Sequence, residues 1–221
     1  MNNPVLLVVG AGPGVGASVA RRFGREGYDV ALLARDPERL KDVGESLQAG
    51  GVTTGWSTVD VTDAAALTAS IERFGDHAGH LDVLHFNPSR FRHADPLSLT
   101  AEDLLDDVRL GVAPLLTAVQ AARPFLRPGS RVVATGSMAA DQPWHEAASL
   151  GVQKAGLRNL VRSIDATLRD DGVRAVSVTV NGTLERGTDL DPDRVGDAIF
   201  EATRQPEDAW RVEVPYPARA R

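Results

Sequence analysis

The stretch VLLVVGAGPGVG, residues 5–16, joins a continuous apolar run to a turn that is rich in glycine. Five apolar residues in a row are typical of a strand that is buried on both faces. Glycine lets the backbone approach a ligand where any Cβ would collide, and the first turn of a following helix offers N–H groups to an anion. We therefore expect a strand, a turn that holds a pyrophosphate, and a helix that begins near Val15.

The glycines of this turn follow the pattern Gly-x-x-x-Gly-x-Gly at Gly10, Gly14 and Gly16, with Gly12 between them. The other common spacing, Gly-x-Gly-x-x-Gly, fails because Val15 stands at its last position. A different interpretation is a turn that needs glycine only so that the helix can pack on the strand. The strand before and the helix after favour a dinucleotide-binding turn. Its candidate cofactor-binding residues are Gly10, Gly12, Gly14, Val15 and Gly16.

The rest of the chain repeats this unit of strand and helix. Further strands are expected at residues 30–34, 54–59, 81–86, 131–135, 173–180 and 210–214. Helices are expected between them, including one over residues 100–126 that is kinked at Gly111 and Pro114. Parallel strands need crossover connections, so this alternation predicts an α/β fold: a doubly wound, parallel, seven-stranded sheet of the Rossmann type in three α/β/α layers. No linker-like stretch interrupts residues 1–221, which we expect to form a single NAD(P)-binding domain.

Composition argues against several classes of partner. The 221 residues include 24 basic and 30 acidic ones, and the resulting net charge of -6 argues against nucleic acid or an anionic membrane surface. Cysteine is absent, which excludes disulfides and Cys-based metal sites, and no metal site is expected. No apolar run approaches the roughly 18 residues that span a bilayer, and the first residues do not resemble a signal peptide. We expect a cytoplasmic protein that acts on a small molecule.

A second motif follows the strand at residues 131–135. Ser137 lies two residues after that strand, and Lys154 lies on the next helix, four residues after Leu150. Together with the glycine pattern, this resembles the short-chain dehydrogenase/reductase family, whose signature is a strand-end serine followed by Tyr-x-x-x-Lys. The resemblance implies that Ser137 hydrogen-bonds the substrate oxygen and that Lys154 holds the nicotinamide ribose. Leu150 stands where the family has its proton-donating tyrosine, so Ser137 and Lys154 are the catalytic candidates.

Leu150 also has an explanation from packing. It begins a stripe at helical spacing that continues through Lys154, Leu157, Val161, Ile164 and Leu168. A lysine on an apolar stripe needs a partner. A ribose diol would be a suitable partner, and a carboxylate in a salt bridge is the alternative.

The resemblance extends to the residues that follow two other strands, the third and the fourth. Asp60 and Val61 lie where the family contacts adenine, although an Asp before a helix is also an ordinary loop residue. Asn87 matches the first residue of the family's Asn-Ala-Gly, whereas Pro88 and Ser89 do not match the next two. We therefore count Asp60, Val61 and Asn87 among the cofactor-binding candidates.

The end of the second strand decides between the two nicotinamide cofactors. Ala34 takes the position that is usually acidic in NAD enzymes, and Arg35 follows it. An arginine there would pair with the additional phosphate of NADP. Asp36 could bind a ribose instead, but an Asp directly before Pro is expected to cap the following helix. The sequence favours NADP(H) over NAD(H).

Other departures from the family concern the reaction. The family's catalytic asparagine would fall near residues 108–112, which contain none, and the short segment 183–190 predicts a small or absent substrate lid. Substitute proton donors are a water molecule held by Ser137 and Lys154, or one of four side chains: His145, Ser149, Gln153 and, with less support, Asp141.

Three functions remain open. The sequence favours an NADP-dependent oxidoreductase that acts on a small carbonyl or alcohol with an atypical proton donor. The alternatives are a catalytically inactive dinucleotide-binding or regulatory protein and a non-redox enzyme on the same fold. Members of the family commonly form dimers or tetramers through the helices that flank the serine strand, here residues 102–126 and 146–169, so a homodimer or homotetramer is expected.

Overall fold

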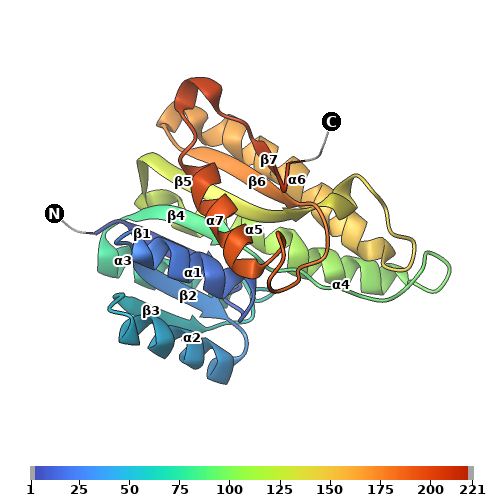
Figure 1. The fold of residues 1–221 in the computed structure, drawn as a ribbon, viewed down its shortest axis with the longest axis horizontal. Helices are drawn as coiled ribbons and strands as arrows, with labels where there is room; N and C mark the ends of the chain where they lie inside the picture. The colour runs from blue at the N-terminus through green and yellow to red at the C-terminus, as the bar shows by residue number, and fades with distance from the viewer. Residues whose placement is uncertain (1–2, 219–221) are drawn as a thin grey trace.

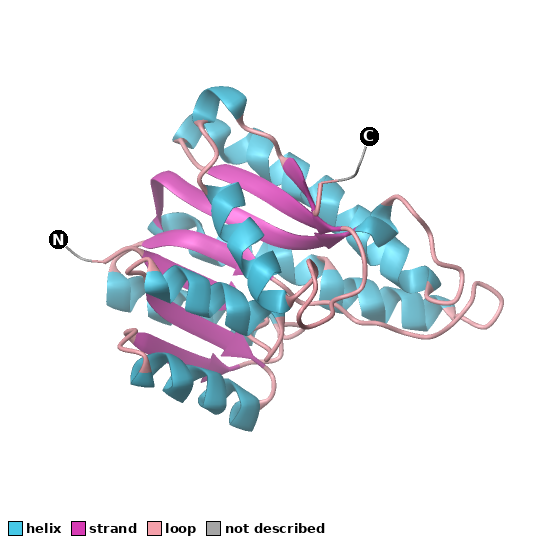
Figure 2. Ribbon diagram, viewed as in Figure 1, coloured by secondary structure: helices cyan, strands magenta, loops and turns pink. Residues whose placement is uncertain are grey.

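The computed structural model describes residues 3–218, and its seven strands form one sheet in the order β3-β2-β1-β4-β5-β6-β7. Every pair of neighbouring strands is parallel, so the arrows in Figure 2 run in one direction. The strands are β1 (Val5–Val9), β2 (Asp29–Ala34), β3 (Thr54–Thr58), β4 (Leu81–Phe86), β5 (Leu126–Ser137), β6 (Arg174–Val180) and β7 (Glu213–Tyr216). The predicted doubly wound parallel sheet is confirmed.

Helices cover both faces of the sheet, as Figure 1 shows. One layer consists of α1 (Val15–Arg25), α2 (Pro37–Ala49) and α7 (Pro192–Thr203). The other consists of α3 (Ala64–Ala78), α5 (Ala113–Ala122) and α6 (Ala148–Leu168), with α4 (Ala101–Gly111) packed against α6. Each layer has its own apolar core: Leu6 and Val8 of β1 belong to the first, and Leu7 and Val9 to the second. This burial on both faces explains why β1 is apolar throughout.

Most helices begin at a residue whose side chain accepts a backbone N–H. The caps of α2, α3, α4 and α7 are Asp36, Asp63, Thr100 and Asp191. The predicted role of Asp36 is confirmed, because its Oδ1 accepts the N–H of Arg39 at 3.1 Å. Helix α1 differs, since its N-cap is Gly14 and no side chain caps it. The N-terminus of α1 therefore lies beside the glycine turn without a side-chain acceptor.

Several element boundaries differ from the prediction. The helical stretch expected at 100–126 is two helices, α4 and α5, which meet at Val112 and are followed by a short 3₁₀ helix, η1 (Arg123–Phe125). Strand β5 begins at Leu126 rather than Arg131, because Leu126 already pairs with Leu81 of β4. Three further 3₁₀ turns are η2 (Met138–Ala140), η3 (Arg169–Asp171) and η4 (Glu207–Ala209).

The last strand also lies later in the chain than expected. Trp210 was predicted to begin it, but its indole Nε1 donates to the Ala175 carbonyl at 3.1 Å, and strand β7 starts at Glu213. Strand β7 extends to Tyr216, two residues beyond the expected end at residue 214.

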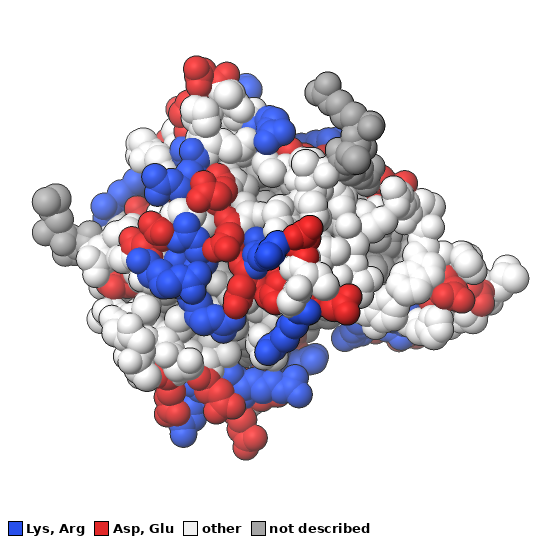
Figure 3. Space-filling model, in the orientation of Figure 1, with Lys and Arg blue, Asp and Glu red and all other residues white. Residues whose placement is uncertain are grey.

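The surface carries charges of both signs. Over α1 and α7, basic and acidic side chains lie side by side (Figure 3), with Arg21 2.7 Å from Asp193 and Arg22 2.9 Å from Asp197. This face therefore lacks the continuous basic patch that typically binds nucleic acid. Among the helices of residues 3–218, none combines the length and the apolar character needed to cross a bilayer.

Candidate functional site

A cavity of about 930 Å³ lies at the carboxyl ends of β4, β5 and β6. Ligands of doubly wound sheets bind at this edge. Val15 reaches the cavity from the N-terminus of α1, Asn87 from the end of β4, Ser137 from the end of β5, and Leu150 and Lys154 from α6. The structure thus brings the beginning of the glycine-turn helix and both catalytic candidates to one cavity.

The glycines of the turn differ in what surrounds them. A Cβ on Gly16 would lie 2.5 Å from the Gly10 carbonyl oxygen, so Gly16 is required for the packing of α1 against the turn. Gly10 has a φ of +89°, and a Cβ there would meet Pro88 at 3.0 Å. A Cβ on Gly12 or Gly14 would meet no protein atom within 4 Å. Packing therefore explains Gly10 and Gly16, whereas the space beside Gly12 and Gly14 is open to a ligand.

Asn87 links the end of β4 to the glycine turn through hydrogen bonds. Its side-chain Nδ2 donates to the Gly10 carbonyl oxygen at 3.0 Å, and its backbone N–H donates to the Val9 carbonyl at 2.9 Å. The backbone N–H groups of Gly10 and Ala11 both donate to the Leu33 carbonyl, at 2.8 and 3.0 Å. The turn is thus held from both sides by β4 and β2, which fixes its position before any ligand arrives.

The remaining cofactor candidates follow β2 and β3. Arg35 is exposed directly after β2. Asp60 Oδ1 accepts the backbone N–H of Thr62 at 2.9 Å and its hydroxyl at 2.8 Å, and these bonds hold the pKa of Asp60 below its usual range. Val61 is buried in the core that faces α3. Asp60 therefore orders its own loop, and the contacts of Asp60 and Val61 with adenine stay a prediction.

Ser137 and Lys154 present different donors to the cavity. Ser137 Oγ accepts the N–H of Ala139 at 3.2 Å, which leaves its hydroxyl hydrogen for another acceptor. Lys154 is only 5% exposed, and its Nζ donates to the Thr135 carbonyl oxygen at 2.8 Å. Burial lowers the pKa of Lys154 to about 8. Its protein partner is thus a backbone carbonyl rather than the carboxylate considered from the sequence.

Leu150 is half-buried and forms part of the cavity wall. The apolar stripe predicted to follow it is confirmed, because Leu157, Val161, Ile164 and Leu168 are all buried in the core. Within residues 3–218, no tyrosine lines the cavity. Tyr28 packs edge-on against Phe23, and Tyr216 lines a separate hollow beside α7.

The four side chains considered as substitute proton donors do not line the cavity. Ser149 is buried and donates to Asp107 Oδ2 at 2.7 Å, and Gln153 bonds the backbone of Arg90 through both ends of its amide. Asp141 pairs with Arg158 at 2.8 Å, and His145 is exposed in the loop before α6. The structure therefore does not bring any of them to Ser137.

A fully buried carboxylate behind this wall was not expected from the sequence. Asp107 on α4 accepts from Arg92 Nε and Nη2 at 2.9 and 3.0 Å, and from Arg90 and Ser149. Burial alone would raise the pKa of Asp107, but the bonds from Arg92 and Ser149 outweigh it and hold that pKa below its usual range. Asp107 thus ties α4, the loop after β4 and the start of α6 together. The sequence shows only that Asp103 and Asp107 share a helix face, which does not reveal which one is buried.

The region of the family's catalytic asparagine is filled by other atoms. A Cβ on Gly111, where α4 ends, would lie 2.4 Å from Gln153 Oε1. Gln153 therefore occupies the space into which a side chain at this position would project.

The mouth of the cavity is apolar, a feature that the sequence does not predict. Phe91 and Trp144 are 57% and 46% exposed, and their ring centroids are 5.4 Å apart. Leu184, from the segment after β6, is 45% exposed and belongs to the same wall. No pattern in the sequence joins these three residues, because they come from three separate loops.

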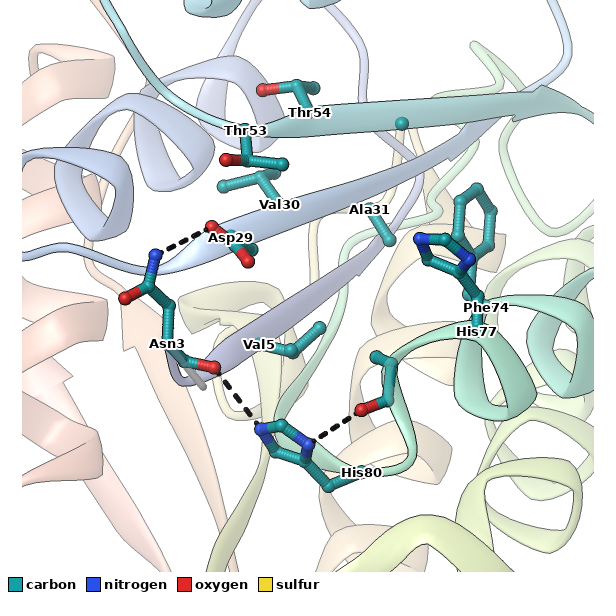
Figure 4. A pocket seen from close by; sticks show the side chains of 12 residues that line it. Asn3, Val5, Asp29, Val30, Ala31, Thr53, Thr54, Phe74, His77 and His80 are labelled. Carbon is teal, nitrogen blue, oxygen red and sulfur yellow. Dashed lines mark hydrogen bonds between the residues drawn. The ribbon is translucent and has the colours of Figure 1, made fainter. Parts of the chain in front are cut away.

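A second cavity, of about 520 Å³, lies at the opposite edge of the sheet, where β1, β2 and β3 begin (Figure 4). Its polar groups bond one another: Asn3 Nδ2 donates to Asp29 at 3.1 Å, and the ring nitrogens of His80 face the carbonyls of Ala78 and Asn3 at 3.0 and 3.2 Å. His77 and Phe74 reach it from α3. None of the predicted site residues lies there.

Comparison with known proteins agrees with this arrangement. The family model described as short chain dehydrogenase matches residues 4–192. An uncharacterized oxidoreductase of Staphylococcus epidermidis is 22% identical over 213 residues, which cover 91% of each chain. A short chain dehydrogenase from Mycobacterium smegmatis has a TM-score of 0.89 at 25% identity, with 99% of this chain and 94% of that chain covered. A metagenomic short-chain oxidoreductase in complex with NADP has a TM-score of 0.85 at 23% identity and 96% coverage of both chains. The chain belongs to the short-chain dehydrogenase family.

Proposed function

We propose that this protein is an NADP-dependent oxidoreductase that reduces a small carbonyl compound, or oxidises the corresponding alcohol, with a proton donor other than tyrosine. One observation carries the proposal. The space beside Gly12 and Gly14 is open at the uncapped N-terminus of α1, and Val15, the first residue of that helix, lines the cavity that holds Ser137 and Lys154. A dinucleotide whose pyrophosphate lies at that N-terminus would extend its nicotinamide toward those two side chains.

The residues around the cavity fit the parts of such a cofactor. The backbone N–H groups at the start of α1 would hold the pyrophosphate, and Asp60 with Val61 would contact the adenine. Arg35, exposed after β2, would pair with the additional phosphate of NADP. Lys154, with donors left beyond its bond to Thr135, would hold the nicotinamide ribose. When bound, the nicotinamide ring supplies or accepts the hydride.

The substrate side of the cavity is formed by neutral groups. Ser137 would donate its hydroxyl hydrogen to the substrate oxygen, where negative charge develops as hydride reaches the carbonyl carbon. The wall formed by Phe91, Trp144 and Leu184 favours an uncharged, apolar substrate.

Titration with NADPH and with NADH tests the cofactor assignment. We expect tighter binding of NADPH and its oxidation in the presence of some member of a panel of aldehydes, ketones and quinones. Failure to bind either nucleotide would overturn the proposal, and preference for NADH would overturn the choice of cofactor.

A catalytically inactive cofactor-binding protein is the second candidate, and Leu150 together with the filled space at Gly111 favours it. It predicts nucleotide binding without turnover of any carbonyl. The variant Leu150→Tyr separates the two functions. Turnover that appears only in this variant would identify a reductase that has lost its donor, whereas turnover by the wild type excludes the inactive protein.

We further propose that the protein forms a dimer or tetramer through α4, α5 and α6. Each of these helices exposes a large apolar side chain: Leu105 is 56% exposed, Leu116 46% and Val152 48%. Exposed apolar side chains grouped on adjoining elements are typical of an interface. Sedimentation of the wild type and of Val152→Glu would test this, with dissociation expected in the variant.

A further inference from the structure

Among the residues of the described range 3–218 that line the 930 Å³ cavity, Lys154 is the one with an ionisable side chain. The other lining residues are apolar, are glycines, or carry neutral hydroxyl or amide groups. Reduction of a carbonyl leaves negative charge on its oxygen, and a positioned acid that supplies the proton contributes roughly 10²- to 10⁴-fold to the rate. Of the described side chains that line this cavity, Lys154 alone can be that acid, and a water molecule is the alternative.

We propose that the Lys154 ammonium is itself the proton donor, in place of the tyrosine that Leu150 replaces. This inference rests on the proposed carbonyl reduction. Hydride from the reduced nicotinamide forms a bond to the carbonyl carbon, and the electron pair of the C=O π bond takes a proton from Lys154 Nζ. The products are the alcohol, the oxidised nicotinamide and a neutral Lys154 amine, which regains its proton from solvent.

The position of Nζ suits this role. It is fixed by its 2.8 Å bond to the Thr135 carbonyl, and Thr135 precedes Ser137 by two residues on β5. Two residues of strand span about 6.6 Å, so an oxygen bonded to Ser137 Oγ can lie between that hydroxyl and Nζ. An ammonium has three donors, and the bond to Thr135 uses one of them. Leu150 places no competing hydroxyl in this space.

The charges around Lys154 allow its ammonium to release a proton. Within residues 3–218, no carboxylate lies within 4.0 Å of Lys154 Nζ, so no ion pair retains the charge. Two carboxylates that contact α6 or its start are themselves paired with arginines, Asp107 with Arg92 and Asp141 with Arg158. Burial lowers the pKa of Lys154 to about 8, close to the pH at which a general acid acts best.

His85 is a buried titratable group whose pKa responds to the charge of Lys154. The Nε2 atom of His85 lies 2.9 Å from Thr135 Oγ1. Burial, and to a lesser degree the charge of Lys154, lowers the pKa of His85 to about 3. His85 is therefore neutral at working pH and does not act as a proton reservoir for Lys154.

The test compares Lys154→Arg with the matched variant His145→Ala, which removes an exposed ionisable group outside the cavity. Arginine keeps the charge and the hydrogen bonds but does not release a proton in this pH range. We expect Lys154→Arg to bind NADPH within about threefold of the wild type and to lose roughly 100-fold in turnover. His145→Ala should keep both values within twofold. Lys154→Met, with its fold checked by circular dichroism, should show the same loss of turnover.

The pH profile of wild-type activity distinguishes a proton-donating lysine from a structural one, because deprotonation of a purely structural lysine would not change that profile. Its kcat/KM for carbonyl reduction should decrease above about pH 8 as Lys154 deprotonates, and this decrease should be missing from the residual activity of Lys154→Met. If Lys154→Arg keeps the turnover of the wild type, or if His145→Ala abolishes turnover, the inference is overturned while the proposed function stands. A wild type that reduces no carbonyl overturns the proposed function, and the inference with it.

Discussion

The β1–α1 turn and the region that runs from β5 to α6 adjoin one cavity but depend on the sequence in different ways. In the turn, recognition relies on backbone N–H groups and on the space that Gly12 and Gly14 leave open. In the second region, it relies on the identity of single side chains, above all Ser137, Leu150 and Lys154. A substitution such as the leucine at 150 can therefore change the reaction while the cofactor site and the fold persist.

The largest expected effect lies in the second region. Ser137→Ala removes the hydroxyl that would donate to the developing oxyanion, so turnover should decrease by roughly 10²- to 10³-fold. The affinity for NADPH should stay unchanged, because Ser137 is not among the groups assigned to the cofactor. Steady-state kinetics and a fluorescence titration measure the two effects. An equal loss of turnover and of NADPH affinity would place Ser137 in the cofactor site, and the two regions would then not differ in this respect.

The turn offers a matched pair of variants. Gly12→Ala meets no protein atom, so it should leave the free energy of unfolding unchanged and weaken NADPH binding at least about tenfold, as expected if a pyrophosphate occupies that space. Gly16→Ala brings a methyl group to 2.5 Å from the Gly10 carbonyl oxygen and should lower the free energy of unfolding by about 1–3 kcal/mol. Urea unfolding and nucleotide titration distinguish them. Wild-type affinity in Gly12→Ala would contradict a cofactor cradle here.

The fold was predictable because its signals are local. Buried parallel strands appear as continuous apolar runs, as in β1, and helix starts appear as capping residues such as Asp36 and Thr100. The boundaries that differed depend on distant partners: Leu126 joins β5 because Leu81 lies opposite, and Trp210 stays outside β7 because its indole bonds Ala175.

The site was predictable only in part, for a reason visible on α6. Successive residues on a helix point about 100° apart, so Leu150 and Lys154 line the cavity while Ser149 and Gln153, each one residue earlier, face Asp107 and Arg90. The sequence does not reveal which of these adjacent stripes faces the cavity. Nor does it reveal that Asp107 is buried, since that depends on Arg92 in a loop outside α4.

A smaller effect is expected at the adenosine end of the cofactor. Arg35→Ser removes the charge that would pair with the additional phosphate of NADP, so the dissociation constant for NADPH should increase about tenfold, which corresponds to about 1.4 kcal/mol. The value for NADH should change by less than twofold, because NADH lacks that phosphate. Parallel titrations measure both. Equal weakening of the two nucleotides would indicate a general role for Arg35 and no selectivity.

The smallest expected effect concerns the stability of the fold in acid, which depends on His85 of β4. The pKa of His85 is lowered by burial to about 3 in the folded protein, against 6.5 for the exposed group, and its Nδ1 has no hydrogen-bond partner within residues 3–218. Below pH 6.5 the unfolded chain therefore binds a proton that the folded protein does not. The stability contributed by neutral His85 is present above pH 6.5 and is lost progressively between pH 6.5 and 3, by about 1 kcal/mol over the first pH unit.

His85→Gln isolates this contribution, because glutamine stays neutral and its amide can still bond the Thr135 hydroxyl. Urea unfolding at pH 6.5 and 5.5 should show a decrease in stability that is about 1 kcal/mol larger for the wild type than for the variant. The other histidines are common to both proteins, so the difference between the two decreases belongs to residue 85. Identical decreases would mean that His85 takes up a proton in the folded protein. The charge next to Thr135 would then change with pH at the same place where Lys154 is anchored, and the reaction region would respond to acid while the glycine turn did not.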